Sequence, residues 1–249
     1  GNYEDCKDCD LIIITAGRNR KPGETRLDLI AGNSAILKNV VDQMKPHYTK
    51  GVIMIVSNPV DVLVYQCTKW MGLPNGMVFG TGCILDSSRF TRLIADYTRL
   101  NTEVVKATIV GEHGDAQIPI WSRVSIAGVP IQEYCENVGL RWGENIRKDI
   151  SDKVREMGAT IIKGKGRTHY GIATCVCYLA EAVLNQRLTI APVSTMFQGE
   201  YGIEDVCLSV PSIIGVNGVE KRLEERWAEE EFLAFRQAAE KMRNVLKTL

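Results

Sequence analysis

The chain has 249 residues, of which 45% are hydrophobic and 24% charged, a composition that excludes a disordered, collagen-like or coiled-coil protein. Thirty basic and thirty acidic residues give a formal net charge of zero at pH 7, which argues against long-range attraction to nucleic acid or to an anionic membrane surface. At about 150 residues per domain, the length predicts one large or two modest domains.

The first hundred residues alternate between short strand-like runs and segments with helical periodicity. Two β-branched runs, residues 11–15 and 52–56, are apolar on both faces, as buried parallel strands are. Residues 27–44, between them, carry apolar side chains at close to helical spacing. We further predict a helix after Pro59, a strand near 77–79 and a helix at about 85–97. This alternation is typical of an α/β fold.

Beyond Gly111 the pattern is less regular and indicates an α+β region. We predict short alternating segments at 121–126, helices at 142–163, 170–184 and 224–246, and antiparallel strands at 193–198 and 206–210. No repeat, low-complexity tract or flexible linker divides the chain. We therefore expect two regions, residues 1–80 and 81–249, that share an interface.

The eight cysteines are scattered, and most of them lie in apolar runs, so we expect reduced, buried thiols in a cytoplasmic protein. Cys6 and Cys9 have the spacing of a redox or zinc pair, but no second cysteine or histidine pair completes a zinc site, and we expect no metal. No apolar run approaches the length of a membrane span, and the first residues lack the regions of a signal peptide. We expect a protein that stays in the cell without a membrane or nucleic-acid partner.

A polar stretch at residues 17–26 follows the first predicted strand and carries four cations within nine residues. Loops at the carboxyl ends of parallel strands are where α/β folds bind ligands, and clustered cations suit an anionic substrate. A solvated basic turn is the simpler alternative.

Asp86 and Arg89 lie one turn apart at the start of a predicted helix, and therefore on one face of it. Such a pair is commonly a surface ion pair, and an acid in a first helical turn is commonly a dipole residue. The functional alternative is that Asp86 orients a histidine while Arg89 holds a carboxylate with its bidentate fork.

His113 stands in the segment Gly111–Asp115, directly after an apolar run. We expect it to follow a strand in a tight exposed turn, where the flanking glycines let backbone approach a ligand. A lone histidine is more often structural, so these five residues alone leave catalysis open.

Five segments carry together a signal that none of them carries alone. They are Thr15–Gly17, Pro22–Leu29, Val56–Asp61, Leu85–Phe90 and Gly111–Asp115. In this order and spacing, across essentially the whole chain, they resemble the NAD-dependent L-lactate/malate dehydrogenases, and most of all their bacterial lactate members.

The resemblance implies a role for each matching residue. His113 would be the catalytic acid/base, oriented by Asp86, and Arg26 would close over the site and polarise the substrate carbonyl. The implied substrate-binding residues are Arg89, Asn58, Arg20 and Thr168, and the implied NAD-binding residues are Thr15, Ala16, Gly17, Val56 and Asn58. The substrate would be a small 2-oxo or 2-hydroxy acid, and the enzyme a homotetramer or dimer.

The resemblance also implies the fold: part of a Rossmann-type parallel sheet at residues 1–80, followed by an α+β catalytic domain at 81–249. The glycine-rich turn and the acidic residue that bind the dinucleotide are not among these residues. We therefore expect the first strands of the Rossmann sheet to be missing. An inactive fragment that cannot bind dinucleotide is the alternative.

Arg20 bears on the choice between lactate and malate. In the family, lactate enzymes usually carry glutamine at the matching position, whereas malate enzymes carry an arginine that neutralises the second carboxylate of oxaloacetate. The flanking residues 21–29 and 119–122 and Thr168 resemble bacterial lactate enzymes instead, some of which also carry this arginine. We expect L-lactate dehydrogenase activity, with malate dehydrogenase as the alternative.

Overall fold

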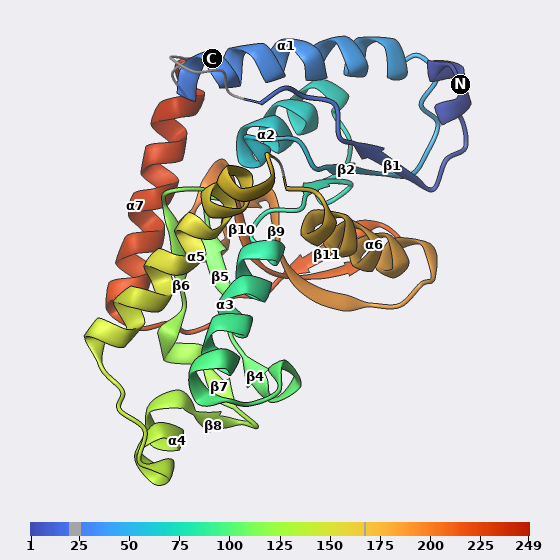
Figure 1. Cartoon of the computed structure of the whole chain (residues 1–249). Coiled ribbons are helices and arrows are strands. Elements are labelled where there is room, and N and C mark those ends of the chain that lie inside the picture. Colours follow the sequence, from blue (N-terminus) through green and yellow to red (C-terminus); the bar gives the residue numbers. More distant parts are fainter. Residues whose placement is uncertain (20–25, 167) are drawn as a thin grey trace.

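The structure, a computed structural model, describes residues 1–19, 26–166 and 168–249, and of Arg26 and Leu27 only the helical backbone. The first half shows the α/β alternation that the sequence predicts (Figure 1). Its elements are β1 (Leu11–Ile14), α1 (Arg26–Met44), β2 (Val52–Ile55), α2 (Val60–Met71), β3 (Val78–Gly80) and α3 (Ile84–Thr98). β1 pairs with β2 and β2 with β3, both in parallel.

The second half continues the same sheet with antiparallel strands and adds a separate three-stranded sheet. Its elements are β4 (Val105–Lys106), β5 (Ile109–Gly111), β6 (Gln117–Pro119), β7 (Ser125–Ile126), β8 (Val129–Pro130), α4 (Ile131–Val138), α5 (Glu144–Lys165), α6 (Tyr170–Leu184), β9 (Thr189–Gln198), β10 (Glu204–Gly215), β11 (Gly218–Arg222) and α7 (Glu229–Leu246). β3 joins β9 through the antiparallel partners Gly80 and Ser194. The strand order is therefore β1-β2-β3-β9-β10-β5-β6, with β11 beside β10, and the separate sheet is formed by β4, β7 and β8.

Both faces of the sheet are covered, which explains why the run at β2 is apolar throughout. Ile53 and Ile55 pack in a core with residues of α1 and α2. Val52 and Met54 point to the other face and pack in a core with residues of α6. Because successive strand side chains point to opposite faces, a strand covered on both sides needs apolar residues at every position.

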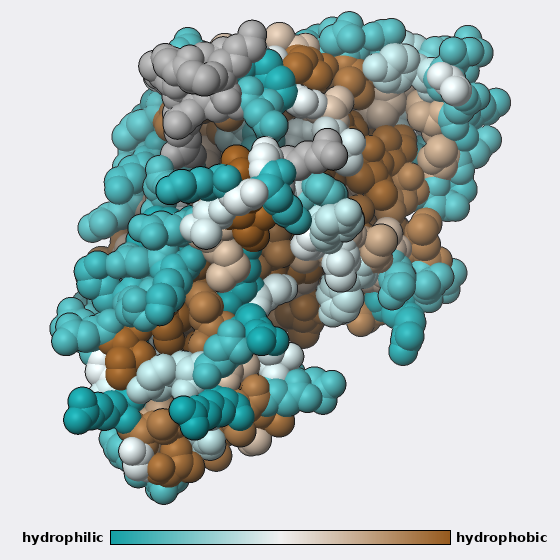
Figure 2. Space-filling model, viewed as in Figure 1, coloured by the Kyte–Doolittle hydropathy of each residue, from teal (hydrophilic) through white to brown (hydrophobic). Residues whose placement is uncertain are grey.

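Burial of β1 was predicted wrongly. The side chain of Ile13 is 39% exposed, because β1 has only β2 beside it among the described strands. Figure 2 shows apolar surface over the part of the molecule where Figure 1 places β1 and β2. The apolar run therefore predicts the strand correctly but not its burial.

The helix expected from residue 224 begins only at Glu229. The preceding residues make other contacts: the indole of Trp227 stacks on the ring of Tyr201, with centroids 4.6 Å apart, and the amide of Glu225 donates to the Tyr201 hydroxyl. We also did not predict α4 or β11. The pair Asn217-Gly218 is a hairpin signal, and Gly218 has a φ of +81° where β11 begins.

The thiols are mostly buried, as expected, and all eight are free. The exceptions are Cys6 and Cys9, which are half-buried, and Cys177 on α6, which is exposed. Over the described ranges, no helix combines the length and apolar character that crossing a membrane requires.

Candidate active site

A cavity of about 550 Å³ lies at the carboxyl ends of the parallel strands. Eight of the residues singled out from the sequence line it: Thr15, Gly17, Val56, Asn58, Asp86, Arg89, His113 and Thr168. They come from loops and helices far apart in the chain, and the parallel sheet brings them to one edge, where α/β folds bind their ligands.

His113 and Asp86 form the centre of the site. Nδ1 of His113 lies 2.6 Å from Oδ2 of Asp86, whose side chain is only 4% exposed. The turn that carries His113 follows β5, but it is less exposed than predicted, since Glu112 is buried and the His113 side chain is 26% exposed. With Nδ1–H donating to the carboxylate, Nε2 is the ring nitrogen that can exchange a proton with a ligand.

The surroundings raise the pKa of His113 above its usual 6.5. Burial is the largest single influence and acts in the opposite direction, because it disfavours the charged imidazolium. The hydrogen bond to Asp86, with the negative charges of Asp86 and Asp61, outweighs it. The imidazolium is therefore stabilised inside a partly enclosed cavity.

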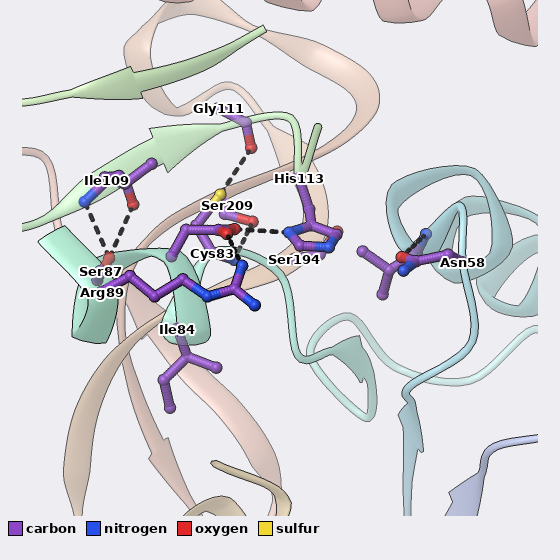
Figure 3. A network of polar contacts seen from close by, with 12 residues as sticks. Asn58, Cys83, Ile84, Ser87, Arg89, Ile109, Gly111, His113, Ser194 and Ser209 are labelled. Carbon is purple, nitrogen blue, oxygen red and sulfur yellow. Dashed lines mark hydrogen bonds and ion pairs between the residues drawn. The ribbon is translucent and has the colours of Figure 1, made fainter. Parts of the chain in front are cut away.

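Arg89 holds the other oxygen of the same carboxylate. Its Nη1 lies 3.2 Å from Oδ1 of Asp86, and its side chain is 13% exposed. Figure 3 shows Arg89 on one side of His113 and Asn58 on the other. Among the described residues, Nε and Nη2 of Arg89 have no hydrogen-bond partner, so the guanidinium keeps donors for a carboxylate ligand.

Asn58 lies at the opposite side of the cavity, held through its backbone. Its carbonyl accepts a 2.6 Å hydrogen bond from Nδ2 of Asn33, a buried residue of α1. The Asn33 side chain also accepts from the amide of Arg18 and donates to the Arg18 carbonyl. Asn33 therefore links the loops that follow β1 and β2, a role that no sequence pattern indicates.

Not every predicted residue is placed at the cavity. Ala16 is not among its lining residues, and its carbonyl accepts a 2.6 Å hydrogen bond from Ser57. Arg20 and the side chain of Arg26 lie outside the described residues.

The α5 side of the cavity was missed from the sequence. Arg155, Gly158, Ala159 and Ile162 line it from this helix. The sequence predicts α5 only as a helix, because residues of mixed polarity on an amphipathic helix do not indicate which cavity they face. Within the described ranges, no group of histidine, cysteine and acidic residues is arranged to hold a metal ion.

Comparisons with known proteins agree with this arrangement. Residues 1–80 match the family model of the lactate/malate dehydrogenase NAD binding domain, and residues 83–249 that of the lactate/malate dehydrogenase alpha/beta C-terminal domain. The chain is 41% identical over 249 residues to an L-lactate dehydrogenase of Thermoanaerobacterium saccharolyticum, covering all of this chain and 80% of that protein.

Solved structures agree as well. A minor L-lactate dehydrogenase from Enterococcus mundtii, in a ligands-bound form, superposes with a TM-score of 0.95 at 38% identity, covering 100% of this chain and 79% of the other. An L-lactate dehydrogenase from Clostridium thermocellum gives a TM-score of 0.88 at 43% identity, covering 100% and 80%.

Proposed function

Because this chain belongs to the lactate/malate dehydrogenase family, we propose that it acts as an NAD-dependent L-lactate dehydrogenase, which interconverts pyruvate and L-lactate. The observation that carries this function is the Arg89–Asp86–His113 constellation at one wall of the cavity. It places a carboxylate-binding guanidinium beside a histidine whose protonated form is stabilised, as reduction of a 2-oxo acid requires.

The proposed mechanism assigns one task to each of these groups. Arg89 binds the carboxylate of pyruvate, so that the carbonyl oxygen lies within reach of His113. As the carbonyl carbon is reduced, Nε2 of the imidazolium donates its proton to the oxygen, and in lactate oxidation the neutral ring takes that proton back. Asp86 keeps Nδ1 protonated and stabilises the cationic form.

The residues present fit the nicotinamide end of NAD. Thr15, Gly17, Val56 and Asn58 line the cavity where β1 and β2 end. At Gly17, an added Cβ would lie only 3.2 Å from Cβ of Ser57, so a glycine here lets the loops that follow β1 and β2 pack closely at the cavity. When bound, NADH supplies the hydride.

The remaining roles follow from the family motifs and are part of the proposal. Asn58 and Thr168 contact the substrate, Arg26 polarises the carbonyl, and Arg20 faces the substituent of the 2-oxo acid. Ala16, with Thr15 and Gly17, completes the NAD-binding loop through its backbone.

Substrate preference tests the function directly. We expect kcat/KM for pyruvate to exceed that for oxaloacetate. Arg20→Gln should lower the residual oxaloacetate efficiency by roughly ten- to hundredfold, since a hydrogen bond to a charged group contributes about 1.5–3 kcal/mol, and leave pyruvate reduction nearly unchanged. Steady-state kinetics following NADH absorbance measure both. A parent enzyme that prefers oxaloacetate would instead identify a malate dehydrogenase.

The raised pKa of His113 predicts a pH dependence with a definite sign. Pyruvate reduction needs the imidazolium, so kcat/KM should be constant below that pKa and fall as the pH rises through it, while lactate oxidation shows the converse. In Asp86→Asn the ring loses its anionic partner, so its pKa falls and the midpoint for pyruvate reduction moves to lower pH.

Asp96→Asn is the matched control, because Asp96 lies on the same helix but pairs with Arg92 at the surface. Its pH profile should coincide with that of the parent. An Asp86→Asn profile that also coincides with the parent, while hydride transfer limits the rate, contradicts the assignment.

We further propose that residues 1–80 and 81–249 serve as the cofactor and catalytic regions of a cytoplasmic homo-oligomer, a tetramer or a dimer. Exposed apolar side chains of α6 and β9, among them Tyr178 and Ile190, are the kind of surface that a second copy covers.

A further inference from the structure

Asp61 is a buried carboxylate that the proposed mechanism does not use. It lies in the first turn of α2, and the residue is only 2% exposed. Its position near a helix N-terminus favours the anion, but burial of a charge is costly unless hydrogen bonds satisfy it.

Two contacts connect Asp61 to other elements of the site. Oδ2 accepts a 2.8 Å hydrogen bond from the backbone amide of His113. Oδ1 accepts a 2.5 Å hydrogen bond from Oγ of Ser194, a fully buried residue of β9. One carboxylate therefore joins α2, the catalytic turn and the central sheet.

This tether restricts the catalytic turn, in which Gly114 directly follows His113 and Gly111 precedes it by two residues. Gly111 has a φ of +90° and Gly114 a φ of +158°, and a turn with glycines on both sides has many accessible backbone conformations. Asp86 fixes the ring at Nδ1, but a hydrogen bond to the ring alone does not fix the backbone that carries it.

We infer that Asp61 is a positioning residue for His113: it anchors the backbone amide while Asp86 anchors the ring, so that Nε2 stays directed at the substrate carbonyl. Because Asn58 lies three residues before Asp61, in the loop that leads into α2, the anchor also connects the His113 backbone to the opposite side of the cavity. This inference rests on the proposed function, since it concerns the same proton transfer.

The charge of Asp61 adds a second effect. Asp61 is one of the groups that raise the pKa of His113, together with Asp86 and against burial and Arg89. Among the residues that the structure describes, the other charged groups that lie in the turn or line the cavity are Glu112 and Asp115 in the turn itself, and Arg18 and Arg155 across the cavity. Asp61 both accepts the backbone amide of His113 and places a negative charge beside its ring.

Two substitutions separate the anchor from the charge. In Asp61→Asn, the asparagine side chain can still accept a hydrogen bond from the His113 amide and donate one to Ser194. The anchor therefore remains, while the negative charge is lost. We expect kcat to stay within a few fold of the parent value and the midpoint of the pH profile for pyruvate reduction to move to lower pH. Asp61→Ala removes the anchor as well as the charge. We expect kcat to fall by about a hundredfold, because a displacement of about 1 Å in a catalytic group lowers the rate by such a factor. NADH binding, measured by fluorescence, should be retained.

A matched control is Glu231→Gln. Glu231 is also a buried carboxylate that accepts backbone amides, those of Ser122 and Ala228, but it caps α7 away from the cavity. We expect this variant to lower Tm and leave the pH midpoint unchanged. Asp61→Ala with full kcat and only a lower Tm would mean that Asp61 is structural and would overturn the inference.

A second readout does not depend on turnover. The chain has only three histidines, so NMR can follow the C2 proton of the His113 ring through a pH titration, with His113→Asn to assign the signal. In Asp61→Asn the titration midpoint should move to lower pH, and an unchanged midpoint refutes the electrostatic half of the inference. A parent protein that fails to reduce pyruvate while this midpoint still moves contradicts the proposed function instead.

Discussion

Replacing His113 with asparagine lowers kcat for pyruvate reduction by a factor on the order of 10³, within the range that a positioned acid/base contributes. Asparagine can still donate a hydrogen bond to the carbonyl oxygen, but it cannot transfer a proton to the alkoxide as it forms. Lactate oxidation should fall by a similar factor, because the same ring takes the proton in that direction. Stopped-flow measurement of NADH consumption and formation gives both rates.

The control for this variant is His47→Asn. His47 follows α1 and does not line the cavity, so its replacement should leave both rates within about twofold of the parent, as surface substitutions generally do. The affinity for NADH should be similar in the parent, in His113→Asn and in His47→Asn. A His113→Asn enzyme that keeps a tenth or more of the parent kcat would mean that another group supplies the proton.

Arg89→Lys keeps the positive charge and removes the planar fork. We expect kcat/KM for pyruvate to fall by about 10²-fold, mostly through KM, because loss of one partner of a buried charge pair costs roughly 2–5 kcal/mol and lysine recovers part of it. The ratio of kcat/KM for pyruvate to kcat/KM for pyruvamide, which lacks the carboxylate, should decrease by the same factor. Steady-state kinetics on both compounds measure this ratio.

Arg92→Lys is the companion substitution on the same helix. Its guanidinium pairs with Asp96 in solvent and its side chain is 68% exposed, so we expect unchanged kinetics. If Arg89→Lys lowered the rates on pyruvate and pyruvamide equally, Arg89 would act through Asp86 and His113 and not by binding the carboxylate.

Local patterns predict local structure in this chain. The period of the apolar residues is enough to predict β2, α2 and α3, because both faces of β2 are covered and each helix buries one face. At β1 the same pattern predicts the strand correctly but not its burial, because β1 has only one neighbouring strand among the described residues. The reasoning fails at residues 224–228, where contacts with Tyr201 replace the first turns of the expected helix.

The residues of the site could be predicted only where they belong to a sequence motif that resembles a known family. His113 and Asp86 are 27 residues apart, and nothing in either local segment requires them to meet. Their proximity was expected from a resemblance and is present in the structure. Asp61 lies 52 residues from His113 and 133 from Ser194, and such contacts depend on the sheet order, which no local pattern determines.

The pairing of β3 with β9 limits how the enzyme can open. Because Gly80 and Ser194 are paired across the two halves, hinge rotation of one half against the other would break the central ladder and pull Asp61 from Ser194. We therefore expect ligand entry and release to leave the sheet intact. The sheet holds the proton-transfer groups in a stiff frame, whereas Gly158 and Ala159 line the same cavity from a helix outside the sheet.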